Sequence, residues 1–116
     1  LIHHQFDEGV FTPIGNENWM TLLGKSDFDQ QPLEAAAMVD ACLTAWKITQ
    51  DPSYFRYANE SFKWFLGHNI LNEPLYDPIT GGCRDGLNPF GVNQNKGAES
   101  TLAWLSSLLN MKLNQI

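Results

Sequence analysis

The sequence predicts an all-α fold of antiparallel helical hairpins joined by long irregular loops. Three segments, near 32–49, 51–67 and from about 98 onward, place apolar residues three and four positions apart, as on one face of a helix. Helix start and stop signals border the first two segments. The stretches between them are rich in glycine, asparagine and aspartate and keep no continuous period.

Residues 1–28 are expected to be irregular, because Gly9, Pro13, Gly15 and Gly24 interrupt any regular period. The first helix should begin near Pro32, since proline suits the first helical position, and run to about Thr49. Its buried face is predicted from four apolar residues, which are Ala36, Val39, Leu43 and Trp46. Cys42 lies in the same pattern and is expected to be a buried free thiol.

The second helix follows almost at once. Asp51 can cap it, Pro52 fits its first turn, and Gly67 should end it. Its apolar face is formed by Phe55, Ala58, Phe62 and Phe65. Because so short a connection joins antiparallel helices, the first two helices should form a hairpin.

The third helix is expected from around Ala98, with fraying near Asn114. Its apolar residues include Leu102, Leu105, Leu108 and Leu109. If this helix runs parallel to the first, its N-terminus, the 68–97 segment and residues 1–31 share one end of the hairpin. The polar clusters of the chain lie in those three places, which favours a single site.

Composition limits the classes of function. The chain of 116 residues is long enough for a single domain, 1–116. Its net charge of −6 argues against a nucleic-acid partner, and no apolar run approaches the ~20 residues that span a bilayer. We therefore expect a cytoplasmic protein. The chain opens on Leu1, and we expect it to be a fragment of a longer protein.

Metal and cofactor sites are not expected. His3, His4 and His68 do not form a zinc motif, and Asp77 and Asp85 lack the spacing of a calcium loop. Charged residues make up 17% of the chain, below the typical ~25%, while aromatic residues are 12%. Low charge with many aromatics indicates a surface that something else covers.

The long polar segment after the second helix is the best candidate for a functional site. Connections in compact domains are usually about 4–6 residues, and longer ones tend to be functional or disordered. Apolar anchors at Tyr76, Leu87, Phe90 and Val92 favour an ordered loop. The candidate substrate-binding residues come from this loop and from the segments beside it, and they are Trp19, Asp29, Gln30, Gln31, Arg84, Asp85, Asn93 and Glu99.

The three candidate carboxylates have structural explanations as well as a functional one. Asp29, Asp85 and Glu99 are the candidate catalytic residues, because paired carboxylates perform glycoside hydrolysis. Asp29 and Glu99 flank predicted helix N-termini, where a carboxylate stabilises the helix, and Asp85 precedes a glycine as in many turns. The amides of Gln30 and Gln31 suit sugar hydroxyls, and Trp19 could stack on a sugar ring.

Several sequence blocks carry a resemblance to a known family. They are FTPIGN (11–16), FDQQPLEA (28–35), WFLGHN (64–69), PLYDP (74–78), TGGCRDGL (80–87) and NQNKGAESTL (93–102). Together they resemble the C-terminal helical region appended to bacterial group 1 glycosyltransferases of the retaining, family 4 type. That region is similar to the α/α toroids of six-hairpin glycosidases. Lys96 stands where the pattern has Gln, and the acidic positions are intact.

The resemblance implies a partial α/α toroid and a role in carbohydrate metabolism. A partial toroid leaves apolar helix faces uncovered, so the isolated chain is expected to self-associate. The resemblance also implies a carbohydrate ligand and an upstream glycosyltransferase domain in the same protein, but not a particular reaction. We therefore expect a carbohydrate-recognition or carbohydrate-processing region at the end of a sugar-transfer enzyme. Two alternatives remain: a structural domain that packs on the transferase and binds no sugar, and part of a six-hairpin glycosidase.

Overall fold

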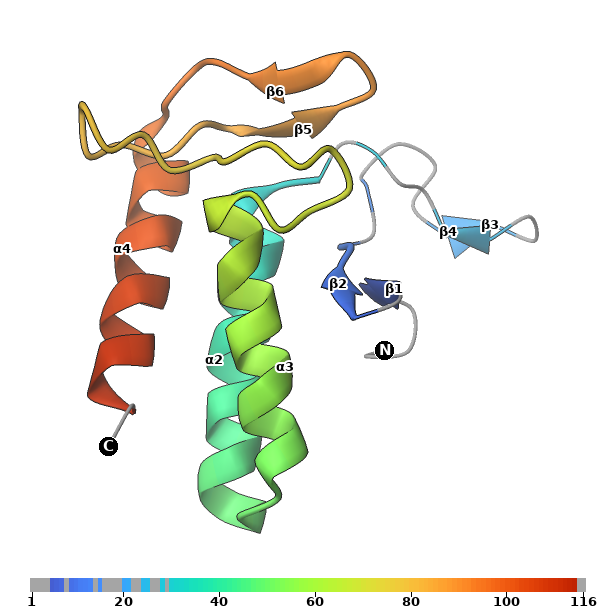
Figure 1. The fold of residues 1–116 in the computed structure, drawn as a ribbon, viewed down its shortest axis with the longest axis vertical. Helices are drawn as coiled ribbons and strands as arrows, with labels where there is room; N and C mark the ends of the chain where they lie inside the picture. Colours follow the sequence, from blue (N-terminus) through green and yellow to red (C-terminus); the bar gives the residue numbers. More distant parts are fainter. Residues whose placement is uncertain are drawn as a thin grey trace.

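The computed structural model describes residues 5–7, 9–13, 15, 20–21, 24–25, 28 and 30–114 (Figure 1). Helices α2, α3 and α4 span Pro32–Thr49, Pro52–Lys63 and Ala98–Leu113, and a 3-10 turn, η1, spans Trp64–Leu66. The strands are β1 (Phe6–Asp7), β2 (Val10–Phe11), β3 (Met20–Thr21), β4 (Gly24–Lys25), β5 (Gly86–Asn88) and β6 (Gly91–Asn93). They pair as antiparallel hairpins β1–β2, β3–β4 and β5–β6.

The helix boundaries agree with the predicted signals. Pro32 and Pro52 each stand at the start of a helix, and Asp51 caps α3 by accepting a hydrogen bond from the Ser53 N–H at 3.0 Å. Gly67 follows η1 with a φ of 111°, a conformation that a residue without a Cβ adopts readily. These local signals are therefore sufficient to place α2 and α3.

The predicted all-α class, with a partial α/α toroid, is wrong. The fold is mixed, because short antiparallel hairpins lie in both segments that we expected to be irregular. The strands are two or three residues long, which is too short for the alternation of a half-buried strand to appear in the sequence. In β5–β6, Gly86 pairs with Asn93 and Asn88 pairs with Gly91.

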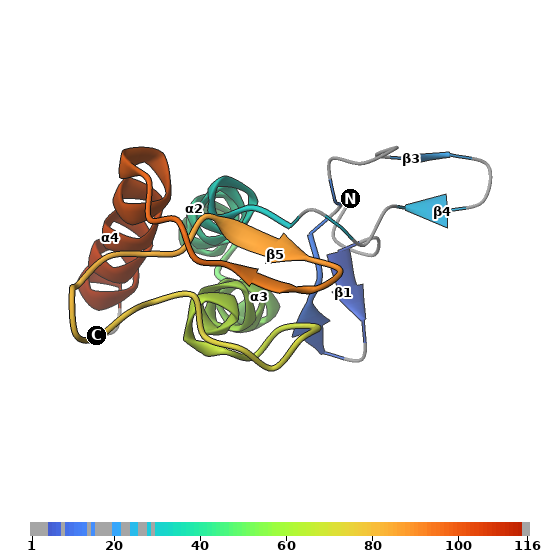
Figure 2. The same cartoon turned by 90° about the horizontal axis from the view of Figure 1, so that it is seen from above.

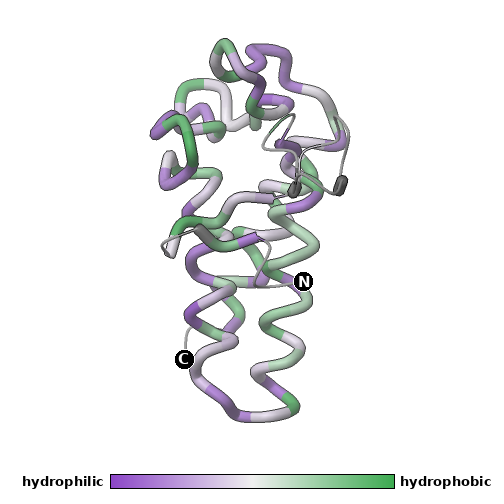
Figure 3. The backbone as a smooth tube through the Cα atoms, turned by 90° about the vertical axis from the view of Figure 1, so that its right-hand side faces the viewer, coloured by the Kyte–Doolittle hydropathy of each residue, from purple (hydrophilic) through white to green (hydrophobic). Residues whose placement is uncertain are grey.

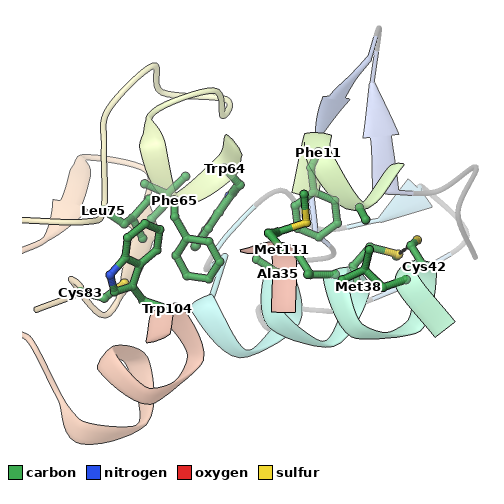
Figure 4. Packing of buried hydrophobic residues seen from close by; sticks show 14 residues of the cluster. Phe11, Ala35, Met38, Cys42, Trp64, Phe65, Leu75, Cys83, Trp104 and Met111 are labelled. Carbon is green, nitrogen blue, oxygen red and sulfur yellow. Dashed lines mark hydrogen bonds between the residues drawn. The ribbon is translucent and has the colours of Figure 1, made fainter. Parts of the chain in front are cut away.

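The core is built largely from aromatic side chains. Trp104 of α4 stacks on Phe62 of α3 at 5.4 Å between ring centroids and on Tyr76 of the long loop at 4.4 Å. Phe65 lies 5.5 Å from the same indole ring. Figure 4 shows Trp104 and Phe65 of this cluster beside a second group formed by Phe11, Met111 and the inner face of α2. Aromatic contacts therefore join α3, α4 and the loop.

All three predicted apolar faces are only partly buried; in that of the second helix, Phe55 and Phe62 are half-exposed. On α2, Val39 and Leu43 are buried as expected, whereas Ala36 and Trp46 are half-exposed. On α4, three of the four leucines predicted to be buried are exposed, namely Leu102, Leu105 and Leu109. The inner face of α4 is instead formed by Ser100, Ala103, Trp104, Ser107 and Met111.

Among the helices that the structure describes, none is long and apolar enough to cross a membrane.

The loop segments gather at one end of the helices. Helix α2 begins, α3 ends and α4 begins at the end where the 68–97 segment and the β5–β6 hairpin lie (Figures 1 and 2). Two backbone hydrogen bonds attach the hairpin to the start of α2, from Gln30 N–H to Leu87 O at 2.9 Å and from Leu87 N–H to Gln30 O at 2.8 Å. Figure 3 shows strongly hydrophilic and strongly hydrophobic residues alternating over this end. The predicted placement of the long loop beside these helix ends is confirmed.

Candidate functional site

A polar cavity lies between the β5–β6 hairpin and the start of α2. Its volume is about 150 Å³. The described residues that line it are Gln31, Asp85, Gly86, Leu87, Asn88 and Asn93. Three of the predicted binding residues are therefore brought together: Gln31, before α2, lies beside Asp85 and Asn93 of the 68–97 segment.

Gln31 reaches the cavity because it precedes α2 in an extended conformation, with φ −120° and ψ 145°. Its side chain makes no hydrogen bond to the helix N-terminus, although the position is one where capping is common. The amide is half-exposed and remains available to a ligand.

Gly86 allows β5 to approach this segment closely. Its φ is +150°, and a Cβ at this position would collide with the carbonyl oxygen of Gln30. A residue with a side chain would both be strained and push the strand away from Gln30. The close contact between β5 and the start of α2, and with it one wall of the cavity, depends on this glycine.

Asp85 is held in place by two backbone contacts. Its N–H donates to Asn95 O at 2.8 Å, and its Oδ1 accepts the N–H of Gly97, the residue before α4, at 2.8 Å. The carboxylate thus satisfies an N–H beside the helix N-terminus, where negative charge is favourable. Its Oδ2 makes no hydrogen bond to any residue that the structure describes, so it can accept one from a ligand.

The side-chain amides of Asn88 and Asn93 are each oriented by one hydrogen bond to a backbone N–H two residues later. Asn88 Oδ1 accepts the Phe90 N–H at 3.0 Å, and Asn93 Oδ1 accepts the Asn95 N–H at 3.0 Å. These local bonds fix the carbonyl oxygen of each amide. Within the described part of the chain, neither Nδ2 group donates a hydrogen bond. The cavity is therefore lined by oriented amide donors and one carboxylate acceptor.

Arg84 belongs to a separate polar cluster in the loop. Its Nε donates to Gln94 Oε1 at 2.9 Å, and its guanidinium lies 3.9 Å from Asp77 Oδ2. The Ile79 N–H and the Thr80 hydroxyl donate to Asp77, and the Lys96 ammonium is 3.3 Å away. These contacts, the Ile79 N–H first, lower the pKa of the Asp77 carboxyl. The cluster stabilises the loop behind the hairpin.

The remaining predicted site residues are distributed as follows. Gln30 is fully buried, and its Oε1 accepts the indole N–H of Trp64 at 3.0 Å. Glu99 is exposed in the first turn of α4, where its charge complements the helix dipole. Trp19 and Asp29 lie outside the described residues.

The cavity contains a single carboxylate among the described residues that line it. Glycoside hydrolysis by paired carboxylates needs a second carboxyl group about 5–9.5 Å from the first. Of the three candidate catalytic residues, Asp85 is the one that the described lining contains.

Metal binding and thiol chemistry find no support in the described part of the chain. It contains no group of three or more histidine, cysteine or acidic residues able to hold a metal ion. Cys42 and Cys83 are free and buried, and burial raises the pKa of the Cys42 thiol to about 11 and that of Cys83 to about 12. Thiols with such pKa values are poor nucleophiles at neutral pH.

Sequence reasoning missed Asn88 as a lining residue. It precedes Pro89, and an Asn-Pro pair followed by glycine two residues later is a turn signal that could have identified the β5–β6 hairpin. Phe90 was expected to be an apolar anchor, yet it lies in the hairpin turn and is 99% exposed.

Comparisons with known proteins add no relative. The sequence matches no protein-family model, and no curated protein matches it significantly. Functional assignment therefore depends on the geometry of the cavity.

Proposed function

We propose that this chain recognises a carbohydrate through the cavity between the β5–β6 hairpin and α2, as the C-terminal region of a sugar-transfer enzyme. The observation that carries the proposal is the convergence of Gln31, Asp85, Asn88 and Asn93 on one cavity. These residues come from the start of α2, the loop and both strands of the hairpin.

The hydrogen-bonding groups match a ligand rich in hydroxyls. A hydroxyl can accept from an amide N–H and donate to a carboxylate at the same time. The Nδ2 groups of Asn88 and Asn93 supply donors, and Asp85 Oδ2 supplies a charged acceptor. Hydrogen bonds to a charged acceptor are stronger than neutral ones. A neutral sugar fits this set better than an anion, which the carboxylate would repel.

The size of the cavity limits the ligand to about one sugar ring. Pockets that enclose a drug-sized ligand measure roughly 300–1,000 Å³, and this cavity measures about 150 Å³. A site that covers so little of its ligand binds weakly, so we expect a dissociation constant on the order of millimolar.

Phe90 extends the site beyond the cavity. Its ring is exposed in the turn between Asn88 and Asn93, both of which line the cavity. Aromatic faces suit the apolar faces of sugar rings, so Phe90 is a candidate stacking surface for a second ring of an oligosaccharide.

The alternative function is a structural domain that packs on the transferase. The hydrogen bond from Gly97 to Asp85 Oδ1 favours it, because it gives Asp85 a role that requires no ligand. The resemblance supports an upstream transferase domain under either function.

The experiment replaces amide donors without changing shape. Asn88→Asp and Asn93→Asp keep Oδ1, and with it the bond to the next backbone N–H, while each loses its NH₂ group. Asn59→Asp on α3, outside the cavity, is the matched control. Titration with methyl hexosides should show at least about a tenfold loss of affinity for the two cavity variants and none for the control.

The structural alternative makes a different prediction. If it holds, the unmodified chain binds no sugar, and Asp85→Asn changes only the melting temperature. Sugar binding that all three asparagine variants retain would also contradict the proposed site.

A further inference from the structure

Helix α4 is apolar on two opposite sides. Its inner face packs on the core through Trp104 and Met111. Its outer face has four leucines that follow one another at intervals of three or four residues, and we call them the leucine ridge. They are Leu102, Leu105, Leu109 and Leu113, which are 65%, 48%, 58% and 64% exposed. A surface helix normally presents polar residues to water, so such a ridge indicates a surface that is covered.

An apolar groove runs along α2. Its volume is about 370 Å³. Most of its lining comes from one face of the helix, with Gln5 and Tyr54 as side walls, and we call it the alanine groove. The described lining residues are Gln5, Glu34, Ala37, Met38, Ala41, Cys42, Ala45 and Tyr54. Alanines at four-residue intervals leave a channel along the helix surface, into which the side-chain ridge of another helix can pack.

The ridge and the groove lie on opposite sides of the molecule. Helix α4 stands on one side of the α2–α3 pair, and the β1–β2 hairpin stands on the other (Figures 1 and 2). Gln5, a wall of the groove, directly precedes β1. One copy of the chain therefore cannot fill its own groove with its own ridge.

We propose that the leucine ridge of one copy docks into the alanine groove of a second copy. Two different surfaces of the same chain then meet, which makes the contact head-to-tail. The groove extends from Glu34 to Ala45, about three helical turns, and this elongated shape suits a helix better than a compact small molecule.

Charges at the helix ends favour an antiparallel contact. Helix α2 has Glu34 in its first turn and Lys47 in its last, and α4 has Glu99 in its first turn and Lys112 in its last. The acidic and basic residues are thirteen positions apart in both helices. Glu34 also lines the groove, so antiparallel docking places the Lys112 end of α4 beside it and opposes the helix dipoles, whereas parallel docking brings Glu99 beside Glu34.

The competing arrangement is a symmetric contact between two leucine ridges. It would cover the ridges but leave the alanine groove open to water in both copies. Docking a ridge into a groove buries both apolar surfaces with one contact, so more apolar area leaves water.

The experiment inactivates each surface separately in the 116-residue chain. Leu105→Glu with Leu109→Glu places charges on the ridge, and Ala41→Arg fills the groove; all three positions are exposed in the monomer. Arg56→Glu on α3 is a charge control outside both surfaces. Sedimentation velocity should show the unmodified chain and the control forming dimers and larger species as concentration rises, with association at least about tenfold weaker in each variant alone.

The decisive sample is a mixture of the two variants. Each supplies the surface that the other lacks, so head-to-tail docking predicts a 1:1 dimer that grows no further. A groove variant that still dimerises with itself would show the symmetric ridge contact instead and overturn the proposal. An unmodified chain that stays monomeric while a hydrophobic dye binds in the groove would also overturn it, because the groove would then be a small-molecule site. The residues that line the carbohydrate cavity line neither surface, so the two proposals can fail independently.

Discussion

Trp64 donates its indole N–H to Oε1 of Gln30 at 3.0 Å, and both side chains are fully buried. Gln30 also exchanges two backbone hydrogen bonds with Leu87 of β5. One residue therefore connects the start of α2, the η1 turn that follows α3 and the hairpin that lines the polar cavity. The geometry of the proposed site depends on this connection.

Replacing Gln30 should destabilise the fold. Gln30→Met keeps a similar volume but leaves the Trp64 N–H buried without its acceptor, so we expect a loss of about 1–3 kcal/mol. Gln31→Met, at the half-exposed neighbouring position, should change stability by less than about 0.5 kcal/mol. Urea unfolding of both variants checks this, and equal stabilities would contradict the connecting role of Gln30.

Stability should decrease in acid, and Asp77 should contribute to the decrease. Its pKa lies below the ordinary value of 3.8 in the folded state, so the unfolded chain binds a proton more readily. The contribution of Asp77 is then fully present above about pH 5 and is lost as the pH falls through the lowered pKa. The stability difference between the unmodified chain and Asp77→Asn, measured by urea unfolding, should shrink over that range. A difference that stays constant from neutral pH into acid would contradict it.

Gly86 and Gly91 provide a matched test of the close approach of β5. Both have φ values that favour glycine, but a Cβ at Gly91 meets open space, whereas a Cβ at Gly86 meets the carbonyl of Gln30. Each alanine substitution should cost about 1–3 kcal/mol from backbone strain, and Gly86→Ala should cost more because of the collision. Thermal unfolding of both variants gives the comparison. Loss of sugar binding is also expected for Gly86→Ala, since it displaces a wall of the cavity.

The two cysteines should be unreactive in the folded protein. Burial raises the pKa of Cys42 to about 11 and that of Cys83 to about 12, so little thiolate exists at pH 8. Iodoacetamide should label neither residue in buffer and both in concentrated urea, as mass spectrometry can count. Rapid labelling of folded protein at either position would show that the thiol is accessible.

The helices could be predicted from sequence because their signals are local. Proline at the start of α2 and α3, Asp51 as a cap and Gly67 at the end act within one or two turns of the residue concerned. The hairpins could not be predicted, because strands of two or three residues are too short to show an alternating pattern in the sequence. Strand β5 is held by hydrogen bonds to Gln30, more than fifty positions away, and no local signal shows that pairing.

Part of the candidate site could also be predicted, because the order of the elements shows which of their ends lie together. Shared helix ends brought Gln31, Asp85 and Asn93 together, as the order of the elements implied. Gln30 and Gln31 are the same type of residue, and the sequence does not separate their roles. The structure shows that Gln30 is buried against Trp64 and that Gln31 lines the cavity. Alternation of side chains in an extended segment separates the two.

The most direct test of the carbohydrate proposal is a nuclear magnetic resonance titration of the ¹⁵N-labelled chain with methyl hexosides up to about 100 mM, a range that suits millimolar affinity. The account predicts saturable shifts of the backbone amides of Gln31, Gly86, Leu87, Asn88 and Asn93, which line the cavity, with the far ends of α2 and α4 unchanged. The absence of saturable shifts with every hexoside, or shifts confined to residues outside the cavity, would contradict it.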